Sequence, residues 1–203
     1  MRPIEPVVLQ GRWVRLEPLA ADHSEPLRAI DDPALFTYLP DVPDDFDGWL
    51  PTALASRDPL FYAAVVDGRT LGRASFLRMD YPNGVAEIGH ILWGHEMRRT
   101  PASTEAVYLM TEHLFGLGAR RVEWKCDNLN EASKAAALRF GFTFEGVFRQ
   151  HKLVKGRNRD TAWFSLLDHE WPARRAALSD WLDPGNFDVD GQQRRRLERP
   201  TTA

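Results

Sequence analysis

The chain has 203 residues, a length that fits one domain with a modest extension. Hydrophobic residues make up 43% of the sequence and charged residues 27%, which are average globular values and exclude wholesale disorder. Twenty-six Lys and Arg residues against 29 Asp and Glu residues leave a formal net charge of −3, whereas dedicated nucleic-acid binders carry a basic excess. Cys126 is the only cysteine, so an intrachain disulfide is excluded. The sequence has no signal-peptide stretch and no apolar run near the roughly 18 residues that span a bilayer, so we expect a soluble cytoplasmic protein without membrane contact.

The first half of the chain predicts strands on either side of a broken helical region. Residues 7–18 alternate apolar and polar side chains, which predicts a first strand. Residues 22–56 have helical character but are cut into short pieces by Pro33, Pro40, Pro43 and Pro51. Two apolar runs around an Asp-Gly dipeptide, 61–66 and 71–77, predict a hairpin. Residues 85–93 predict the next strand.

The second half predicts two further helices and three further strands. Residues 101–117 show the strongest helical pattern of the chain. Residues 120–126 predict a strand, and residues 130–140 predict a short Ala-rich helix. The segments 142–154 and 159–167 predict a long hairpin around a Lys-Gly-Arg-Asn turn.

The last part of the chain predicts one more helix and a tail. An amphipathic helix containing Trp171 and Trp181 is followed by residues 183–203, which are polar and Arg-rich. We therefore predict a single domain over residues 1–182 and a polar C-terminal tail. Strands with interspersed helices in this order predict an α/β (α+β) fold with one mixed sheet and one core.

A candidate anion site lies where a strand leads through a short loop into the strongest helix. Thr100 suits the N-cap position, and Pro101 suits the first helical position, where a missing N–H costs nothing. The free backbone N–H groups of Ala102, Ser103 and Thr104 would then point out of the helix start. Arg98 and Arg99, which directly precede it, add positive charge. Such an arrangement can bind a pyrophosphate. An ordinary capped helix with solvated arginines is the alternative.

A second candidate site opens the Ala-rich helix. Asn130 and Ser133 lie at the junction between a strand and this helix. An amide and a hydroxyl at such a junction could hold a ligand amide and protonate a leaving group. Alternatively, Asn130 is simply a good N-cap residue.

The order of elements and motifs resembles the GNAT superfamily of N-acetyltransferases, and within it the RimJ/RimL-like branch of ribosomal-protein N-terminal acetyltransferases. The resemblance covers roughly residues 8–172 and implies a mostly antiparallel sheet of about seven strands flanked by helices. The motifs that carry it are Glu87-Ile88-Gly89, the segment from Arg98 to Ala106, Asn130-x-x-Ser133 with Gly141-Phe142, Glu145-Gly146-Val147, and Gly156-Arg157-x-Arg159-Asp160.

The resemblance implies acetyl-CoA as co-substrate and needs no metal. Its pantetheine would pair with the backbone of Ile91, Leu92 and Trp93, in a gap between the strands expected at 85–93 and 120–126. Its pyrophosphate would meet residues 98–104, and Asn130 would contribute to the same cofactor site. Glu87, directly or through a water that it polarises, is the candidate base for the attacking amine. Alternatively, it is a solvent-facing strand residue or an ion-pair partner of an arginine.

Two positions depart from the family pattern. Pro101 stands where the phosphate loop has its first glycine, which removes one backbone donor. Ala137 stands where many GNAT enzymes have a tyrosine as general acid, so Ser133 or a water must supply the proton.

His90 and Cys126 are two further candidates for a chemical role near the expected site. Strict alternation puts His90 on the sheet face opposite Glu87, which favours a structural histidine unless a bulge reverses the strand. Cys126 is expected to be a small buried hydrophobe, because no paired histidine is visible to activate it.

The amine acceptor is only weakly indicated. The resemblance places residues 22–47 along the acceptor groove, and this segment has a single basic residue, Arg28, against Asp22, Glu25, Asp31, Asp32, Asp41, Asp44, Asp45 and Asp47. That charge suits a cationic amine, although Asp is also common in turns and caps. Arg149 and His151 are further candidates for acceptor contacts.

Three functional alternatives remain open from the sequence. The first is an acetyl-CoA-dependent N-acetyltransferase that acts on a primary amine, a protein N-terminus or a small molecule, by direct transfer. The second is an inactive acyl-CoA-binding sensor, favoured by Pro101 and Ala137. The third is a nucleic-acid partner bound by Arg194–Arg196, but three arginines in a polar tail are typically solvated and we expect no nucleic acid. A homodimer is compatible with the sequence.

Overall fold

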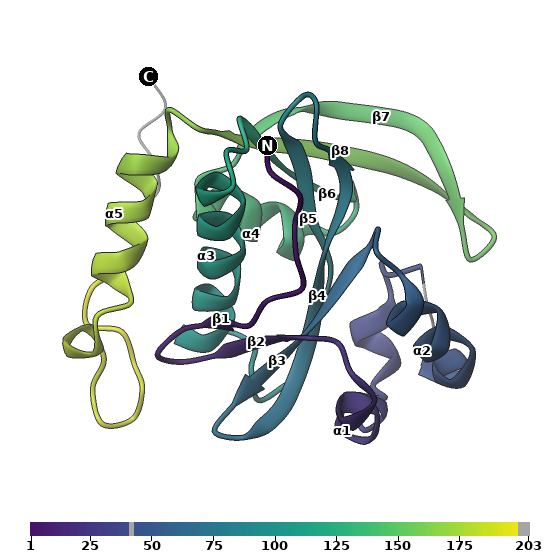
Figure 1. Cartoon of the computed structure of the whole chain (residues 1–203), viewed down its shortest axis with the longest axis horizontal. Coiled ribbons are helices and arrows are strands. Elements are labelled where there is room, and N and C mark those ends of the chain that lie inside the picture. Colours follow the sequence, from purple (N-terminus) through teal and green to yellow (C-terminus); the bar gives the residue numbers. More distant parts are fainter. Residues whose placement is uncertain (41–42, 199–203) are drawn as a thin grey trace.

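The computed structural model describes residues 1–40 and 43–198, and eight strands of this part form one open sheet (Figure 1). Their order across the sheet is β1-β2-β3-β4-β5-β6-β8-β7, and every neighbouring pair is antiparallel except β5 and β6. The strands are β1 (Leu9–Gln10), β2 (Arg15–Pro18), β3 (Leu60–Val66), β4 (Arg69–Asp80), β5 (Val85–Trp93), β6 (Arg121–Asp127), β7 (Thr143–Val154) and β8 (Arg157–Leu167). The predicted mixed, mostly antiparallel sheet is thus confirmed, with one strand more than expected.

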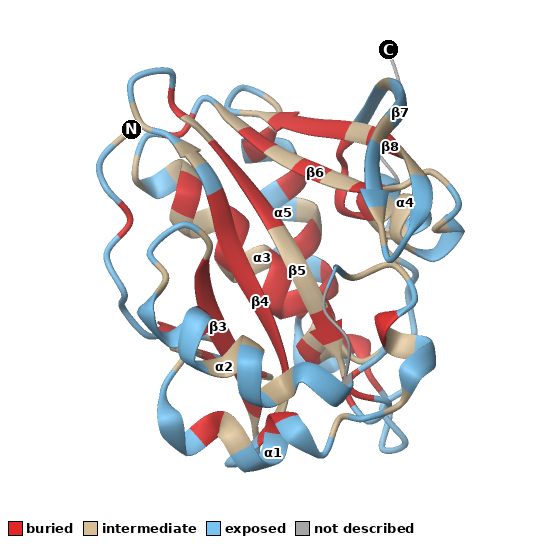
Figure 2. Cartoon of the chain, turned by 90° about the vertical axis from the view of Figure 1, so that its right-hand side faces the viewer, coloured by how far each residue is buried: buried red, intermediate tan, exposed pale blue. Residues whose placement is uncertain are grey.

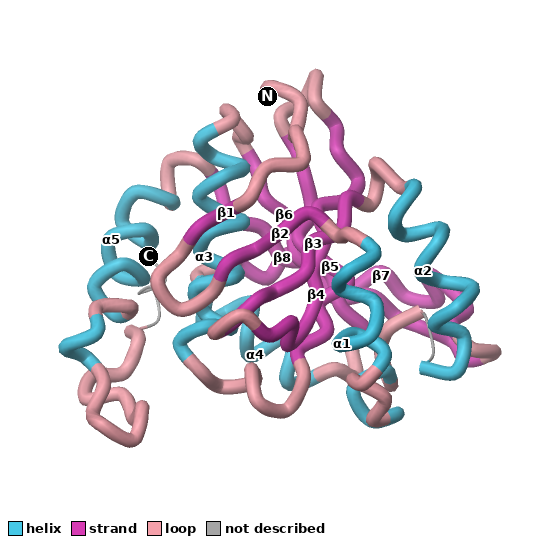
Figure 3. The backbone as a smooth tube through the Cα atoms, turned by 60° about the horizontal axis from the view of Figure 1, so that its bottom comes forward, coloured by secondary structure: helices cyan, strands magenta, loops and turns pink. Residues whose placement is uncertain are grey.

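The helices lie on both faces of the sheet. The α-helices are α1 (Ser24–Arg28), α2 (Phe46–Ala55), α3 (Pro101–Gly116), α4 (Glu131–Phe140) and α5 (Trp171–Trp181), and short 3-10 helices cover Ala21–His23, Pro33–Phe36, Pro43–Asp45 and Pro184–Asn186. Helices α3 and α4 cover one face, while α1 and α2 lie on the other, as Figure 3 shows from below. Helix α5 packs outside α3. No helix of the described ranges is long and apolar enough to cross a membrane.

The main core lies between the sheet and α3. Ala106, Val107, Met110 and Leu114 are buried on this helix at helical spacing, as the sequence pattern predicts, and β5 contributes Ala86 and Ile88 to the same cluster. Figure 2 shows buried segments in red along β3, β4 and β5. Helix α3 is thereby fixed against β5, and the start of α3 is held next to the end of that strand.

The expected first strand is two strands, because a buried glutamate bends the chain between them. The carboxylate of Glu105 on α3 accepts the backbone N–H groups of Arg12, Trp13 and Val14 at 3.0, 2.6 and 3.0 Å. A Cβ atom at Gly11 would collide with this carboxylate, so the turn requires glycine there. The alternating pattern of residues 7–18 could not reveal this turn, because its partner is about ninety positions away in the sequence.

The segment after α5 is folded as far as it is described. Asn186 and Phe187 are buried, and the Phe187 ring packs edge-on against Trp13 and Trp181, with centroid distances of 5.3 and 5.1 Å. The Asn186 side chain donates to the carbonyl of Trp181 and accepts the N–H of Arg195. Ordered packing therefore continues past the predicted domain boundary at residue 182, and residues 199–203 lie outside the described part.

Replacing Glu105 tests its role as the anchor of this turn. Glu105→Ala should lower the free energy of unfolding by about 3 kcal/mol, because three backbone donors lose a charged acceptor in a buried site. Urea denaturation measures the change. Glu96→Ala is the matched control, since Glu96 forms an exposed ion pair with Arg69 and its loss should cost less than about 1 kcal/mol. Equal effects of the two variants would contradict the assignment.

Candidate active site

The candidate site forms where two parallel strands separate. β5 and β6 pair over three residues each, Val85–Glu87 with Arg121–Glu123. Beyond these residues β5 stays with β4 and β6 stays with β8, so the two strands diverge (Figure 2). A cavity of about 220 Å³ lies at the divergence, lined by both strands, by the start of α4 and by the β7–β8 hairpin. This is the gap in which the sequence resemblance expects acetyl-CoA.

A β-bulge in β5 directs an extra side chain into this cavity. Ser75 of β4 pairs with Gly89, but Arg73 pairs with Leu92, so β5 has one residue more than its partner. His90 adopts a positive φ of 48° in the bulge and lines the same cavity as Glu87. Its Nδ1 lies 3.0 Å from the Ser75 hydroxyl oxygen. The prediction that His90 faces away from Glu87 is therefore wrong, because strict alternation fails at the bulge.

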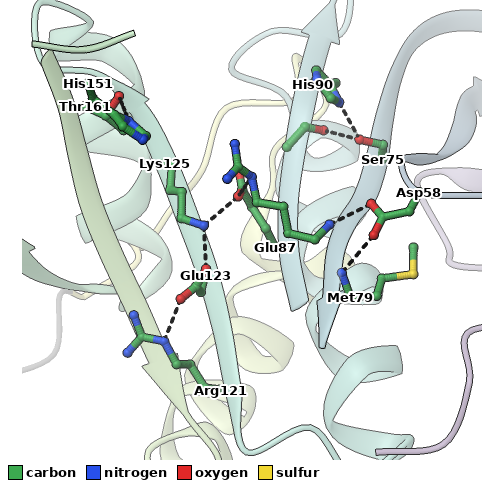
Figure 4. Close-up of polar contacts among 12 residues, drawn as sticks. Asp58, Ser75, Met79, Glu87, His90, Arg121, Glu123, Lys125, His151 and Thr161 are labelled. Carbon is green, nitrogen blue, oxygen red and sulfur yellow. Dashed lines mark hydrogen bonds and ion pairs between the residues drawn. The ribbon is translucent and has the colours of Figure 1, made fainter. Parts of the chain in front are cut away.

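Glu87 is the buried carboxylate of the site, with 5% of its surface exposed. Its Oε2 accepts from Nζ of Lys125 at 2.9 Å (Figure 4). The same oxygen pairs with Nε of Arg78 at 3.0 Å. Burial raises the pKa of Glu87, although Lys125 and Arg78 oppose the shift. Oε1 lies beside Gly89, where a Cβ atom would come within 3.3 Å of it. A carboxylate with a raised pKa accepts a proton more readily than an exposed one, as a general base requires.

Lys125 links the two diverging strands. Its Nζ donates to Glu87 on β5 and to Glu123 on its own strand, at 2.9 and 2.5 Å, and it lies 4.0 Å from the ring centroid of Trp163. Only 4% of this side chain is exposed. Glu123 also pairs with Arg121, so opposite charges alternate along one face of β6. The sequence analysis missed Lys125, although the spacing of Arg121, Glu123 and Lys125 by two residues was a signal that they share a face.

Asn130 and Ser133 meet at the start of α4, as expected, and both line the cavity. The Asn130 side chain caps the helix by accepting the N–H of Ser133 at 3.0 Å, so the capping interpretation is confirmed. The Ser133 oxygen accepts from Nε1 of Trp124 at 2.9 Å. The hydroxyl keeps its own proton as a donor, and a hydrogen bond between Ser133 and the Cys126 thiol acts on the pKa of that thiol.

Cys126 and Ala137 are both buried in this region. Burial raises the pKa of the Cys126 thiol, which keeps it protonated and agrees with its expected structural role. Ala137 belongs to the core between α4 and the sheet, so its position offers no acid to the cavity.

The start of α3 has the predicted cap. Thr100 accepts the N–H of Ser103 at 3.4 Å and donates to the carbonyl of Met97 at 2.7 Å, and Pro101 takes the first helical position. Arg98 and Arg99 are exposed, and neither takes part in an ion pair within the described residues. Both therefore keep their charge available at the helix start.

The remaining predicted cofactor residues have different surroundings. Ile91 lines the cavity at Glu87, whereas Leu92 and Trp93 do not. Ala102 and Thr104 are buried, and the hydroxyl of Thr104 accepts from Nη1 of Arg139 at 3.1 Å. Their contribution to an anion site would come from the backbone at the helix start rather than from these side chains.

The acidic segment lines a different cavity. Residues 22–47 contribute only the neutral side chains of Leu35, Tyr38, Leu39 and Pro40 to the described lining of the cavity at Glu87. Asp22, Asp31 and Asp32 instead line a second cavity of about 660 Å³, beside His95 and Glu96. Asp41 lies outside the described residues. The acidic wall expected for a cationic acceptor is therefore absent from the described lining around Glu87.

Comparison with known proteins supports the family that the sequence resembles. The model of the acetyltransferase (GNAT) domain family matches residues 14–143, well over half of the chain. The chain belongs to the GNAT acetyltransferase family. The crystal structure of a GCN5-related N-acetyltransferase from Brucella melitensis is 49% identical, with a TM-score of 0.94 over 96% of this chain and 94% of that one.

Two curated Bacillus proteins are also similar over part of their length. An uncharacterized N-acetyltransferase p20 from Bacillus licheniformis is 34% identical over 50% of this chain and 57% of its own length. A putative ribosomal N-acetyltransferase, YdaF, from Bacillus subtilis (strain 168) is 32% identical over 54% of this chain and 60% of its own. The match thus spans less than two thirds of these curated relatives. No group of side chains suited to a metal ion occurs in the part of the GNAT chain that the structure describes.

Removing Lys125 tests whether it holds the two strands together electrostatically. Lys125→Met should lower the free energy of unfolding by about 3 kcal/mol, because Glu87 and Glu123 lose the buried cation between them. The pKa of Glu87 then rises further, and its protonation relieves the cost. The loss of unfolding free energy relative to the wild type should therefore be largest at a pH above the pKa of Glu87 in the variant. It should shrink as the pH falls through that pKa.

Urea denaturation over a pH series measures this deficit. Lys134→Met is the matched control, since Lys134 pairs with exposed Glu131 on α4 and should change stability by less than about 1 kcal/mol at every pH. A deficit for Lys125→Met that is constant across the pH series would contradict the charge assignment.

Proposed function

We propose that the chain transfers the acetyl group of acetyl-CoA to a primary amine by direct attack in a ternary complex. The observation that carries the proposal is a buried carboxylate with a raised pKa, Glu87, at the point where β5 and β6 of a GNAT domain separate. The acceptor is a protein N-terminus or a small-molecule amine. The similarity to YdaF, a putative ribosomal N-acetyltransferase, supports the first of these.

The chain's residues divide the proton transfers between them. A protein N-terminus with a pKa of about 8, or an alkylamine with a pKa of about 10, is mostly protonated at neutral pH and must lose a proton before it attacks. Glu87 accepts this proton, directly or through a water, as the nitrogen–carbon bond to the acetyl group forms. Ser133 donates its hydroxyl proton to the departing sulfur as the carbon–sulfur bond breaks, and the second proton, which the attacking nitrogen releases on becoming an amide, restores the Ser133 hydroxyl through a water. Trp124 supports this step because its Nε1–H donates to the Ser133 oxygen and stabilises that oxygen as the proton leaves.

The start of α3 and the splayed end of β5 suit acetyl-CoA. Arg98, Arg99 and the helix start at Thr100 would hold the phosphates, while the backbone of Ile91, Leu92 and Trp93 would pair with the pantetheine. Asn130, which lines the cavity, completes this set. Acetyl-CoA supplies the activated acyl group, and the mechanism uses no metal.

Pro101 and Ala137 favour the alternative of an inactive acyl-CoA-binding sensor. Turnover of any amine acceptor would distinguish an enzyme from such a sensor. Arg195, which belongs to the arginine run of the nucleic-acid alternative, pairs with Asp180 at 3.1 Å. The cytoplasmic location, the absence of nucleic-acid and membrane partners and a possible homodimer stay predictions.

The pH dependence of turnover tests Glu87 as the base. The value of kcat/KM for the acceptor should fall as the pH decreases through the raised pKa of Glu87, above the ordinary value of about 4.3, because only the carboxylate accepts a proton. Glu87→Gln should lose about 100-fold or more in kcat and lack this limb. The limb that reports the acceptor amine remains in both proteins. A variant with wild-type kcat would refute the base assignment, and absence of turnover in the wild type would favour the sensor.

Calorimetric titration with CoA tests the phosphate site. The double variant Arg98→Ala/Arg99→Ala should bind CoA about tenfold more weakly, a loss of about 1.4 kcal/mol. Pantetheine has no phosphates, so its affinity should not change. Arg157→Ala is the matched control, because Arg157 is exposed on the β7–β8 hairpin and does not line the cavity. Equal CoA affinity of the double variant and the control would place the phosphates elsewhere.

A further inference from the structure

The cavity at Glu87 carries an excess of positive charge. Its lining contains two carboxylates, Glu87 and Asp127, against four cationic side chains from four different strands: Arg78, Lys125, Lys152 and Arg159. Arg78 and Lys125 both pair with Glu87. Asp127 accepts the N–H of Leu129, at the end of β6. The carboxylates of the lining therefore do not balance its cations.

Lys152 and Arg159 are the two cations of this lining that form no ion pair with a carboxylate of the described residues. No ion pair within residues 1–40 and 43–198 involves either of them. They pair directly opposite each other in the β7–β8 ladder, where like charges destabilise a hairpin. Nε of Arg159 is buried and has no hydrogen-bond partner. A bound anion would relieve both the repulsion and the missing hydrogen bond.

A register shift in β7 places Lys152 opposite Arg159. The register between β7 and β8 shifts between Phe148 and Lys152, and Gln150 in the shifted stretch has a φ of 49°. The carboxylate of Asp160 fixes the irregularity by accepting the N–H of Gln150 at 2.7 Å. The bulge brings Lys152 opposite Arg159 at the cavity, because it changes which residues of β7 face that side.

Burial and the positive charge around the cavity shift the pKa values of Lys152 and His151. Burial lowers the pKa of Lys152, and repulsion from Arg78 and Arg159 adds to the shift. The pKa of His151 is lowered by burial and by the same cations, so His151 is mostly neutral at neutral pH and adds no charge. Glu87 acts on Lys152 in the opposite direction, which places the pair within electrostatic reach of the candidate base.

We infer that Lys152 and Arg159 bind a carboxylate of the acceptor, so that the preferred substrate is an amine with an acidic group close to its attacking nitrogen. The inference rests on the proposed acetyl transfer and names the class of its acceptor. A purely cationic amine is repelled by the field, whereas a carboxylate pairs with the two cations and leaves the nitrogen free to face Glu87. The field also lowers the pKa of a bound ammonium group, which favours the neutral nucleophile.

Matched acceptors test the inference and distinguish two sources of the carboxylate. The peptide amides Ser-Asp-Asp-Ala-amide and Ser-Asn-Asn-Ala-amide differ only in side-chain charge. The dipeptide Ser-Ala as free acid and as amide tests a terminal carboxylate, and a simple diamine represents a cationic acceptor. The measured quantities are kcat/KM from CoA release with acetyl-CoA, and the dissociation constant of each acceptor with CoA present.

The wild-type protein should prefer at least one acidic acceptor to its neutral partner by about tenfold or more, in kcat/KM or in binding. Lys152→Gln and Arg159→Gln should each reduce this ratio toward one, because kcat/KM for the acidic acceptor falls more than kcat/KM for its neutral partner, while CoA affinity changes by less than about twofold. Arg157→Gln on the same hairpin is the control and should retain the wild-type ratio. The selectivity should also weaken with added salt.

The outcomes separate this inference from the proposed function. Acetylation of neutral or cationic amines at least as fast as acidic ones would leave the transfer function standing and overturn the inference. The inference also fails if both Gln variants keep the wild-type ratio. Absence of turnover with every acceptor would refute the transfer function, and the binding ratios alone would then decide whether the cavity selects a carboxylate.

Discussion

The site depends on one constraint of the sheet, namely that β5 and β6 pair for only three residues before they separate. An antiparallel neighbour holds each strand on its outer side, so both keep their hydrogen bonds while the gap between them stays open. Helix α3 begins after β5 and α4 begins after β6, which brings two helix starts to the same region. Lys125 bridges the gap by its ion pair with Glu87.

Backbone irregularities decide which side chains reach the cavity. The bulge in β5 turns His90 toward it, and the shift in β7 sets Lys152 opposite Arg159. A regular strand would have sent alternate residues to opposite faces, and these side chains would have been elsewhere. Bulges are common next to active sites for this reason. The turn between β1 and β2 is a similar irregularity, since the Glu105 side chain fixes this backbone bend although it is far away in the sequence.

The charged groups differ between the two sides of the cavity. Burial makes Glu87 more basic, while Lys125 and Arg78 keep it from becoming a permanently neutral acid. Ser133 and Asn130 lie at the start of α4, where the cap and Trp124 orient the hydroxyl. The β7–β8 hairpin supplies Lys152 and Arg159, which form no ion pair with a described carboxylate. A negatively charged acceptor completes this distribution better than a cationic one.

The sequence by itself determined the order of the elements, the caps at Thr100 and Asn130, and the family, because these depend on local spacing and turn chemistry. It also named Glu87, Asn130 and Ser133, which the structure brings to one cavity. Only the tertiary structure decided the side on which His90 lies, the partners of Lys125, the turn held by Glu105 and the folded segment around Phe187. Each of these depends on register shifts or on contacts between residues far apart in the chain, which no local pattern encodes.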